Sequence, residues 1–256
     1  MARRATVIKD ARREAGRTAL VLDAGDTLLG QTVSLQSEGA AIVETMNAMG
    51  YDAMAVGRLD LIKGIDVVTR RAQEAQFAIL SCNLVRKGTR ELVLPASTII
   101  ERDGVRFGIL GVTEPQAAQA PGAEETIEVL DPTEAVRAAL PDLQARSDVV
   151  IVLSHLGLEE DLALAKAVPG IDIIVGGRSR QLVQPPEVVG DTIVTQMGFD
   201  GEYMGRLDVT VNEDGRLSDP LGAMIVLGPD YADDSELAAL VARLKGEYGE
   251  PTPPTR

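Results

Sequence analysis

The stretch that decides the fold is VVIVLSHLGLEEDLALAKAVPGIDIIVGGRSR, residues 149–180. Its first apolar run predicts a buried strand over 148–154, its acidic middle predicts a helix over 159–167, and its second apolar run predicts a strand over 171–177. A strand, a helix and a second strand in this order are typical of a parallel sheet covered by helices. We therefore expect an α/β fold.

The same alternation extends in both directions along the chain. Apolar runs predict strands, helical periodicity predicts helices, and the Asp-Gly pairs at 103–104 and 214–215 predict tight hairpin turns. The expected strands are 18–26, 52–57 and 77–83, the expected helices are 38–49, 65–75, 132–145 and 235–248, and the expected hairpins are 97–114, the region of 191–198 and 205–228. Gly50 follows the last apolar residue of its helix and is expected to end it.

Composition limits the function classes. The chain has 256 residues, 45% of them hydrophobic, which is enough for one sizeable core. Its net charge of −14 argues against nucleic acid or an anionic membrane as the main partner. The single cysteine, Cys82, provides neither a disulfide nor a thiolate metal cluster, and its apolar neighbours predict a buried structural thiol.

No targeting or membrane segment is visible. No apolar run approaches the roughly 20 residues that a membrane span needs. The basic N-terminus, MARRATVIKDARREAGR, lacks the apolar core of a signal peptide. A soluble protein is expected, and a cytoplasmic one if the sequence is complete.

Polar residues gather where the predicted strands end. Asp26, Arg58, His155 and Arg178 each follow a different strand, in the segments DAGD, VGR, LSH and VGGR. Ligands of open α/β sheets bind beyond the carboxyl ends of strands, so these four residues predict one cleft. The alternative is that the polar residues merely end strands and that the glycines only make turns.

Six segments of the chain, spread from about Ala2 to Leu217, resemble the catalytic domain of bacterial 5′-nucleotidases, which are calcineurin-like metallophosphoesterases. They are LVLDAGDTLLG, MNAMGYDAMAVGRLD, ILSCN, DGVRFGILGVTEP, VVIVLSHLGLEEDLALAKAVPGIDIIVGGRSR and GRLDVTVNEDGRL. The resemblance implies a sandwich of two mixed β-sheets flanked by helices, in α-β-β-α layers, with a metal site at the strand ends. Family members are often exported.

The resemblance also implies site residues. In the family, two divalent metals bridged by an aspartate bind a phosphate ester and activate water. Asp26 matches the bridging aspartate and His155 matches a metal-ligating histidine. Asn83 matches a position near the rim of the active site, where it could contribute to anion binding, or it could simply cap its strand.

Other family positions have changed. GRLD stands where the family has Gly-Asn-His-Glu/Asp, so Arg58 replaces a metal ligand and Leu59 replaces the catalytic histidine. GGRSR stands where the family has Gly-His-x-His, so Arg178 and Arg180 replace two ligand histidines. A guanidinium has no lone pair to offer a cation. The family's N-terminal Asp-x-His motif is absent.

We expect one domain over residues 1–248 that lacks the first strand of the family, followed by a Pro-rich, disordered tail over 249–256. The chain begins where the helix after the Asp-x-His motif would begin. Either the gene product lacks that strand or the sequence is a fragment.

The favoured hypothesis is a catalytically impaired homologue that serves as a binding or structural module. Two divalent metals carry +4, and Arg58, Arg178 and Arg180 together carry +3, so the arginines are expected to neutralise Asp26 or to hold phosphate or a nucleotide. No resident cofactor is then expected.

Three alternatives stay open. One is a single-metal site that uses Asp26, His155 and either Asp23 or Asp60. Another is an active phosphoesterase with Mn, Zn, Mg or Ca at a rearranged or externally completed site. The last is a non-catalytic subunit that binds a protein partner at an exposed sheet edge.

Overall fold

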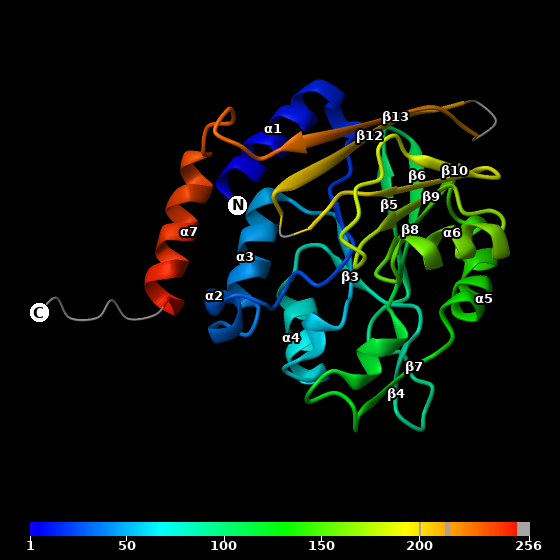
Figure 1. Ribbon diagram of the computed structural model, residues 1–256, viewed down its shortest axis with the longest axis horizontal. Helices are drawn as coiled ribbons and strands as arrows, with labels where there is room; N and C mark the ends of the chain where they lie inside the picture. The colour runs from blue at the N-terminus through cyan, green and yellow to red at the C-terminus, as the bar shows by residue number, and fades with distance from the viewer. Residues whose placement is uncertain (200, 213–215, 250–256) are drawn as a thin grey trace, which may run out of the picture.

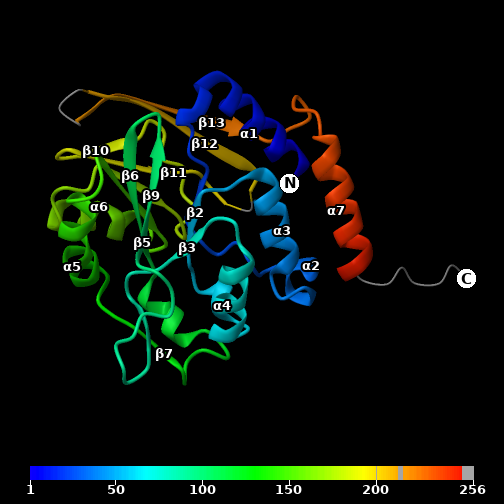
Figure 2. The ribbon, with the colours of Figure 1, turned by 180° about the vertical axis from the view of Figure 1, so that it is seen from behind.

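The computed structural model describes residues 1–199, 201–212 and 216–249. The molecule has four layers, with two sheets inside and helices on both outer faces. Figures 1 and 2 show α1 (Ala2–Ala15), α3 (Ala40–Met49) and α7 (Ser235–Tyr248) on one side and α5 (Pro132–Gln144) and α6 (Leu158–Ala167) on the other. The predicted α/β sandwich is confirmed. The predicted turn at 214–215 lies outside the described residues, as do residues 250–256 of the tail expected over 249–256.

The larger sheet has six strands. Their order is β10 (Glu187–Val189), β11 (Thr192–Gln196), β9 (Ile173–Gly176), β8 (Val149–Ser154), β6 (Val105–Val112) and β5 (Ser97–Arg102). The four central strands are parallel and the two edge strands pair antiparallel, so this sheet is mixed. The strand, helix and strand of residues 149–180 form β8, α6 and β9, with β8 and β9 side by side.

The smaller sheet contains β1 (Leu22–Asp23), β2 (Ala53–Ala55) and β3 (Ala78–Leu80), in that order. Both of its pairings are parallel, so the expectation of two mixed sheets is right only for the larger one. The physical reason lies in the connections: α3 joins β1 to β2 and α4 (Ile65–Glu74) joins β2 to β3, and a helical crossover returns the chain in the same direction.

Side-chain alternation along the strands fills the space between the sheets. The ladder places Ile109, Ile151, Ile173 and Ile193 in one row across the larger sheet, and all four belong to a buried cluster with Ala53, Ala55 and Leu80 of the smaller sheet. The residues between them on each strand face the opposite way. Val150 and Val152, for example, pack with the apolar faces of α5 and α6. A strand buried on both faces is therefore apolar throughout, as VVIVLS is.

Local signals in the sequence fix several boundaries. Gly50 ends α3 in the left-handed conformation, with φ 71°, as predicted. Asp103 and Gly104 both have positive φ and join β5 to β6 in a two-residue hairpin. The Asp131 and Asp234 side chains accept N–H groups in the first turns of α5 and α7.

Further elements complete the described chain. The antiparallel strands β12 (Tyr203–Val211) and β13 (Leu217–Val226) form a two-stranded sheet, and β4 (Leu84–Arg86) pairs with β7 (Ile127–Val129). The short helix α2 (Thr32–Gln36) precedes α3. Within the described ranges, no helix is both long and apolar enough to cross a membrane.

Candidate functional site

The predicted convergence of strand ends is present in the structure. Asp26 Oδ2 lies 3.2 Å from His155 Nε2, although the two residues follow strands of different sheets. The backbone N–H of Leu59, beyond the end of β2, donates to Asp26 Oδ1 at 2.7 Å. Arg58 and Arg178 each stand next to a glycine that packs against His155, so all four strand ends nominated from the sequence meet here.

Asp23 and an unusual backbone conformation hold the turn that carries Asp26. Asp23 Oδ1 accepts the N–H of Gly25 at 2.9 Å and the hydroxyl of Thr27 at 2.6 Å. Asp26 itself has φ 58°, a left-handed conformation that is uncommon for a residue with a side chain. Such backbone strain is found where the surrounding structure fixes a functional side chain.

Asp60 clamps the two loops together. Its carboxylate, fully buried, accepts the backbone N–H groups of Asp26, Thr27, Leu28 and Gly57. Burial, and then the nearby Asp26 carboxylate, raise the pKa of Asp60 to about 7, while the N–H groups of Gly57 and Leu28 act in the opposite direction. Because both oxygens are already bonded to the backbone, Asp60 does not complete a metal site with Asp26 and His155.

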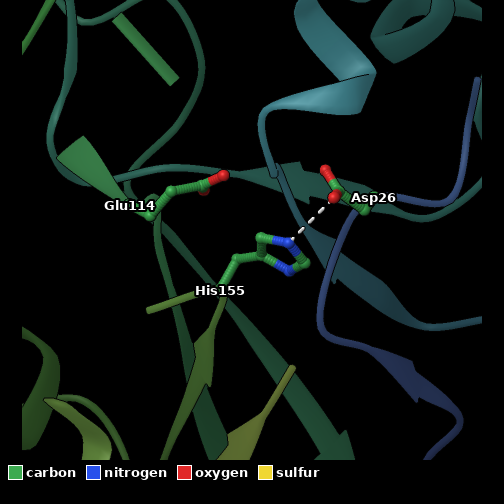
Figure 3. Close-up of side chains that lie close together, drawn as sticks. All are labelled: Asp26, Glu114 and His155. Atoms are coloured by element: carbon green, nitrogen blue, oxygen red, sulfur yellow. Dashed lines mark ion pairs between the residues drawn. The ribbon is translucent and has the colours of Figure 1, made fainter. Parts of the chain in front are cut away.

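Glu114 is a site residue that the strand-end pattern did not nominate. It lies two residues beyond the end of β6, is 2% exposed, and accepts the backbone N–H of Arg58 through Oε1 at 2.9 Å. In Figure 3 its carboxylate lies to the upper left of the His155 ring and that of Asp26 to the upper right. The signal was present in GVTE, since the strand-end rule that nominated Asp26 and His155 applies equally to a glutamate after β6.

His155 is fixed by contacts of both ring nitrogens. Nδ1 lies 2.7 Å from the carbonyl oxygen of Ala24, which makes it the donor to that oxygen, and Nε2 faces Asp26. Burial alone lowers the pKa of His155, but Asp26 and then Glu114 outweigh it and raise the pKa to about 9. One potential ligand atom from each of Asp26, Glu114 and His155 lies within 4.8 Å of the others.

Three glycines allow this close packing. A Cβ atom at Gly57 would lie 2.6 Å from Cδ2 and 2.8 Å from Nε2 of His155, and one at Gly177 would lie 3.0 Å from Nδ1. Gly25, with φ 102°, brings its loop against Gly57 and His155 in the same way. The glycines before Arg58 and Arg178 therefore do more than make turns, because they allow the backbone to approach the imidazole ring.

The three arginines are exposed and do not pair with Asp26. No ion pair joins Arg58, Arg178 or Arg180 to Asp26 in the part of the chain that the structure describes, and the cationic group beside Asp26 is His155. The Arg178 guanidinium donates to the carbonyl oxygen of Leu156 at 2.7 Å, and that of Arg180 lies 5.4 Å from the centre of the Phe199 ring. The expected direct neutralisation of Asp26 by these arginines is therefore not seen among the described residues. Arg178 and Arg180 both have positive φ, and Arg58 contributes its backbone N–H, bonded to Glu114, to the site.

The contacts of Asn83 hold neighbouring backbone segments together. It is fully buried, its amide donates to the carbonyl oxygens of Thr113 and Leu130, and its Oδ1 accepts the N–H of Thr113 at 2.9 Å. With these bonds made, the amide has no donor left for an anion. Its contacts thus match the strand-capping alternative.

A pair of divalent metals, as the resemblance implies, does not fit these residues. By the resemblance, Arg58, Arg178 and Arg180 stand at three ligand positions of the family and Leu59 stands at the position of its catalytic histidine. The structure adds that the Asp60 carboxylate is bonded to the backbone. Each ion of such a pair normally needs four or more ligands. Among the described residues, Asp26, Glu114 and His155 are the one group of three with metal-ligand spacing.

A buried aspartate near the site, Asp161, predicts how the stability of the protein depends on pH. Asp161 is fully buried in α6, its Oδ1 accepts the hydroxyl of Ser154, and its Oδ2 has no partner. Burial raises the pKa of Asp161 to about 7, so the folded protein binds this proton more tightly than the unfolded chain. The free energy of unfolding should then fall as pH rises from about 4, the ordinary aspartate pKa, to about 7.

Asp161→Asn is expected to make that fall shallower, since Asp60 with its raised pKa still contributes to it, and to raise the free energy of unfolding at pH 8 by about 2 kcal/mol. Urea denaturation between pH 4 and pH 8 measures it. The exposed Asp66→Asn variant is the control, and its curve should run parallel to that of the wild type. Parallel curves for wild type and Asp161→Asn would show that Asp161 stays ionised over the whole range.

No protein-family model matches the chain, but comparison with known proteins finds relatives. The trifunctional nucleotide phosphoesterase protein YfkN of Bacillus subtilis (strain 168) is 32% identical over 252 residues, which cover 84% of this chain and 17% of that protein. The snake venom 5′-nucleotidase of Naja atra is 28% identical over 270 residues, 96% of this chain and 51% of the relative. The chain thus spans about half of the length of the Naja atra relative and less of the length of the Bacillus subtilis one.

A solved structure gives the same fold. The 5′-nucleotidase precursor from Thermus thermophilus superposes with a TM-score of 0.88 and 27% identity, over 96% of this chain and 53% of that one. The similarity covers both sheets and the helices that flank them, because nearly the whole chain is included.

Proposed function

We propose that this chain binds phosphate or a phosphate ester at the strand ends without two-metal hydrolysis. The proposal starts from the family: the chain belongs to the 5′-nucleotidases and calcineurin-like phosphoesterases. The observation that supports the proposal is that Arg58 and Arg178 follow glycines that pack against His155. Arg58, Arg178 and Arg180 are exposed, and none of them forms an ion pair with a carboxylate among the described residues. Nucleotide hydrolysis is the activity named for the relatives, and this chain has lost residues that the chemistry needs.

The arginines support anion binding. In a protein with a net charge of −14, most exposed cations are expected to find an acidic neighbour, as Arg106 does with Asp148. Arg178 uses one nitrogen for the Leu156 carbonyl and Arg180 is steadied over Phe199, so each retains donors in a fixed orientation. Guanidinium groups bind phosphate through paired N–H donors.

The loss of hydrolysis is supported by Leu59. Leucine neither donates a proton nor forms a hydrogen bond to the leaving oxygen, and its backbone N–H is bonded to Asp26. The alternative is metal-dependent hydrolysis of a phosphate ester at a rearranged site, which the names of the relatives favour.

Removing the two neighbouring arginines should weaken anion binding. In Arg178→Ala/Arg180→Ala, the affinity for inorganic phosphate and for AMP is expected to fall at least 10-fold, or about 1.4 kcal/mol, because charge-assisted hydrogen bonds are lost. Isothermal titration calorimetry at constant ionic strength measures the change. Arg146→Ala removes an exposed arginine of the surface pair with Asp142 and should leave the affinity unchanged.

An activity assay separates the proposal from its alternative. With AMP or a chromogenic phosphodiester and added Mn²⁺, no turnover above that of the Asp26→Ala variant is expected. Turnover by the wild type that disappears in Asp26→Ala would refute the impaired site and establish hydrolysis.

A further inference from the structure

We infer that Asp26, Glu114 and His155 form a site for one divalent cation, with Glu114 as a ligand outside the set that the resemblance implies. The three residues follow β1, β6 and β8, so the site joins the smaller sheet to the larger one. Cation binding at this site does not depend on whether phosphate binds.

The backbone orients each of the three side chains toward a common centre. Asp26 Oδ1 accepts the N–H of Leu59 and Glu114 Oε1 accepts the N–H of Arg58, which leaves one oxygen of each carboxylate for a cation. His155 Nδ1 donates to the Ala24 carbonyl, so a neutral ring carries its lone pair on Nε2. Metal-ligating histidines and carboxylates are held by outer hydrogen bonds of this kind.

Two of the inward atoms lack a hydrogen-bond partner. His155 Nε2 and Glu114 Oε2 are both buried and form no hydrogen bond, although Nε2 lies 3.2 Å from Asp26 Oδ2, and each residue is 2% exposed. Leaving a buried polar atom unbonded costs about 1–3 kcal/mol, so two such atoms in one cluster indicate a missing partner. A divalent cation would satisfy both atoms and would also balance the two carboxylates, since its +2 charge offsets their −2.

A proton is the competing partner. Protonated His155 offers only +1 against two carboxylates, and it leaves Glu114 Oε2 without a partner. The approach of Asp26 Oδ2 to Nε2, at 3.2 Å, is also the spacing of two ligands on one ion, because ligands about 2.1 Å from a tetrahedral metal lie about 3.4 Å apart.

The donor set indicates the ion. One imidazole and two carboxylates suit Zn²⁺ and Mn²⁺ better than Ca²⁺, which takes six to eight oxygen ligands. Three protein ligands leave a coordination position open to water or to an anion. The cation expected from the donor types is therefore Zn²⁺, with Mn²⁺ as the weaker binder.

Zn²⁺ titration of the metal-free protein tests the site. Equilibrium dialysis with elemental analysis is expected to give one bound Zn²⁺ per chain. Glu114→Gln, which keeps the shape of the side chain, should weaken binding at least 10-fold, whereas the exposed Glu128→Gln should bind as the wild type does. Nitrogen-15 NMR of labelled histidine gives a direct signal, because His155 is the single histidine of the chain.

With Zn²⁺ bound, His155 should be neutral, with the proton on Nδ1 and the metal on Nε2. A doubly protonated ring at neutral pH in the presence of excess Zn²⁺ would overturn the inference. Two bound ions per chain, or equal affinities for wild type and Glu114→Gln, would overturn it as well. The NMR measurement needs no variant, so it tests the site even if Glu114→Gln does not fold.

Discussion

Replacing Gly57 by alanine is expected to lower the free energy of unfolding by about 3 kcal/mol, because the added methyl group has no room. The new Cβ would lie within 2.8 Å of two ring atoms of His155 and would also collide with the Asp26 carboxylate. Neither residue can retreat easily, since Asp26 is bonded to Leu59 and His155 to Ala24. Urea denaturation at pH 7 measures the change.

Gly246→Ala provides the control. Gly246 lies within α7, and no atom would come within 4 Å of its added Cβ. Alanine is favoured over glycine inside a helix by about 1 kcal/mol, so this variant should be more stable than the wild type. Equal effects of the two substitutions would mean that Asp26 and His155 do not pack closely against Gly57.

The fold was predictable because its strands are buried on both sides. VVIVLS and IDIIVG are apolar runs of only six residues, a length typical of buried strands and too short for a helix. Because a helical segment connects them, the two strands are expected to run parallel in one sheet. The helices followed from their apolar faces and from end signals such as Gly50. The pair β4 and β7 carried no such signal, since each strand has three residues and the partners are far apart in sequence.

The site was predictable in position and less so in detail. Strand ends gave Asp26, Arg58, His155 and Arg178, because the carboxyl ends of parallel strands meet at one edge. The strand-end pattern does not include Glu114, because the Asp-Gly turn indicates a hairpin of β6 with β5 and gives no sign that β6 also pairs in parallel with β8.

The orientation of the arginines could not be predicted from residue types. Arg178 and Arg180 replace ligand residues by the resemblance, yet each takes a positive φ that depends on the packing of the loop. The count of charges predicts that the arginines lie against Asp26, whereas in the structure His155 lies there. A charge count therefore predicts which groups share a region but not which of them pair.

Asn83 is the other residue whose replacement should have a large effect. Asn83→Ala is expected to lower the free energy of unfolding by about 4 kcal/mol, because it leaves the N–H and carbonyl of Thr113 and the carbonyl of Leu130 without their partner. The side chain is fully buried, so water cannot replace it without opening the structure. Urea denaturation measures the loss.

Asn47→Ala is the matched control for Asn83→Ala. The Asn47 amide also bridges two backbone groups, the carbonyl of Glu74 and the N–H of Gln76, but it is only partly buried, so its loss should cost about 1 kcal/mol. Asn83 has a second consequence that Asn47 lacks: it holds Thr113, the residue before Glu114. Asn83→Ala should therefore also weaken Zn²⁺ binding in the fraction that stays folded, while Asn47→Ala should not. Stability losses of similar size for both variants would show that the buried amide network does not fix the loop that carries Glu114.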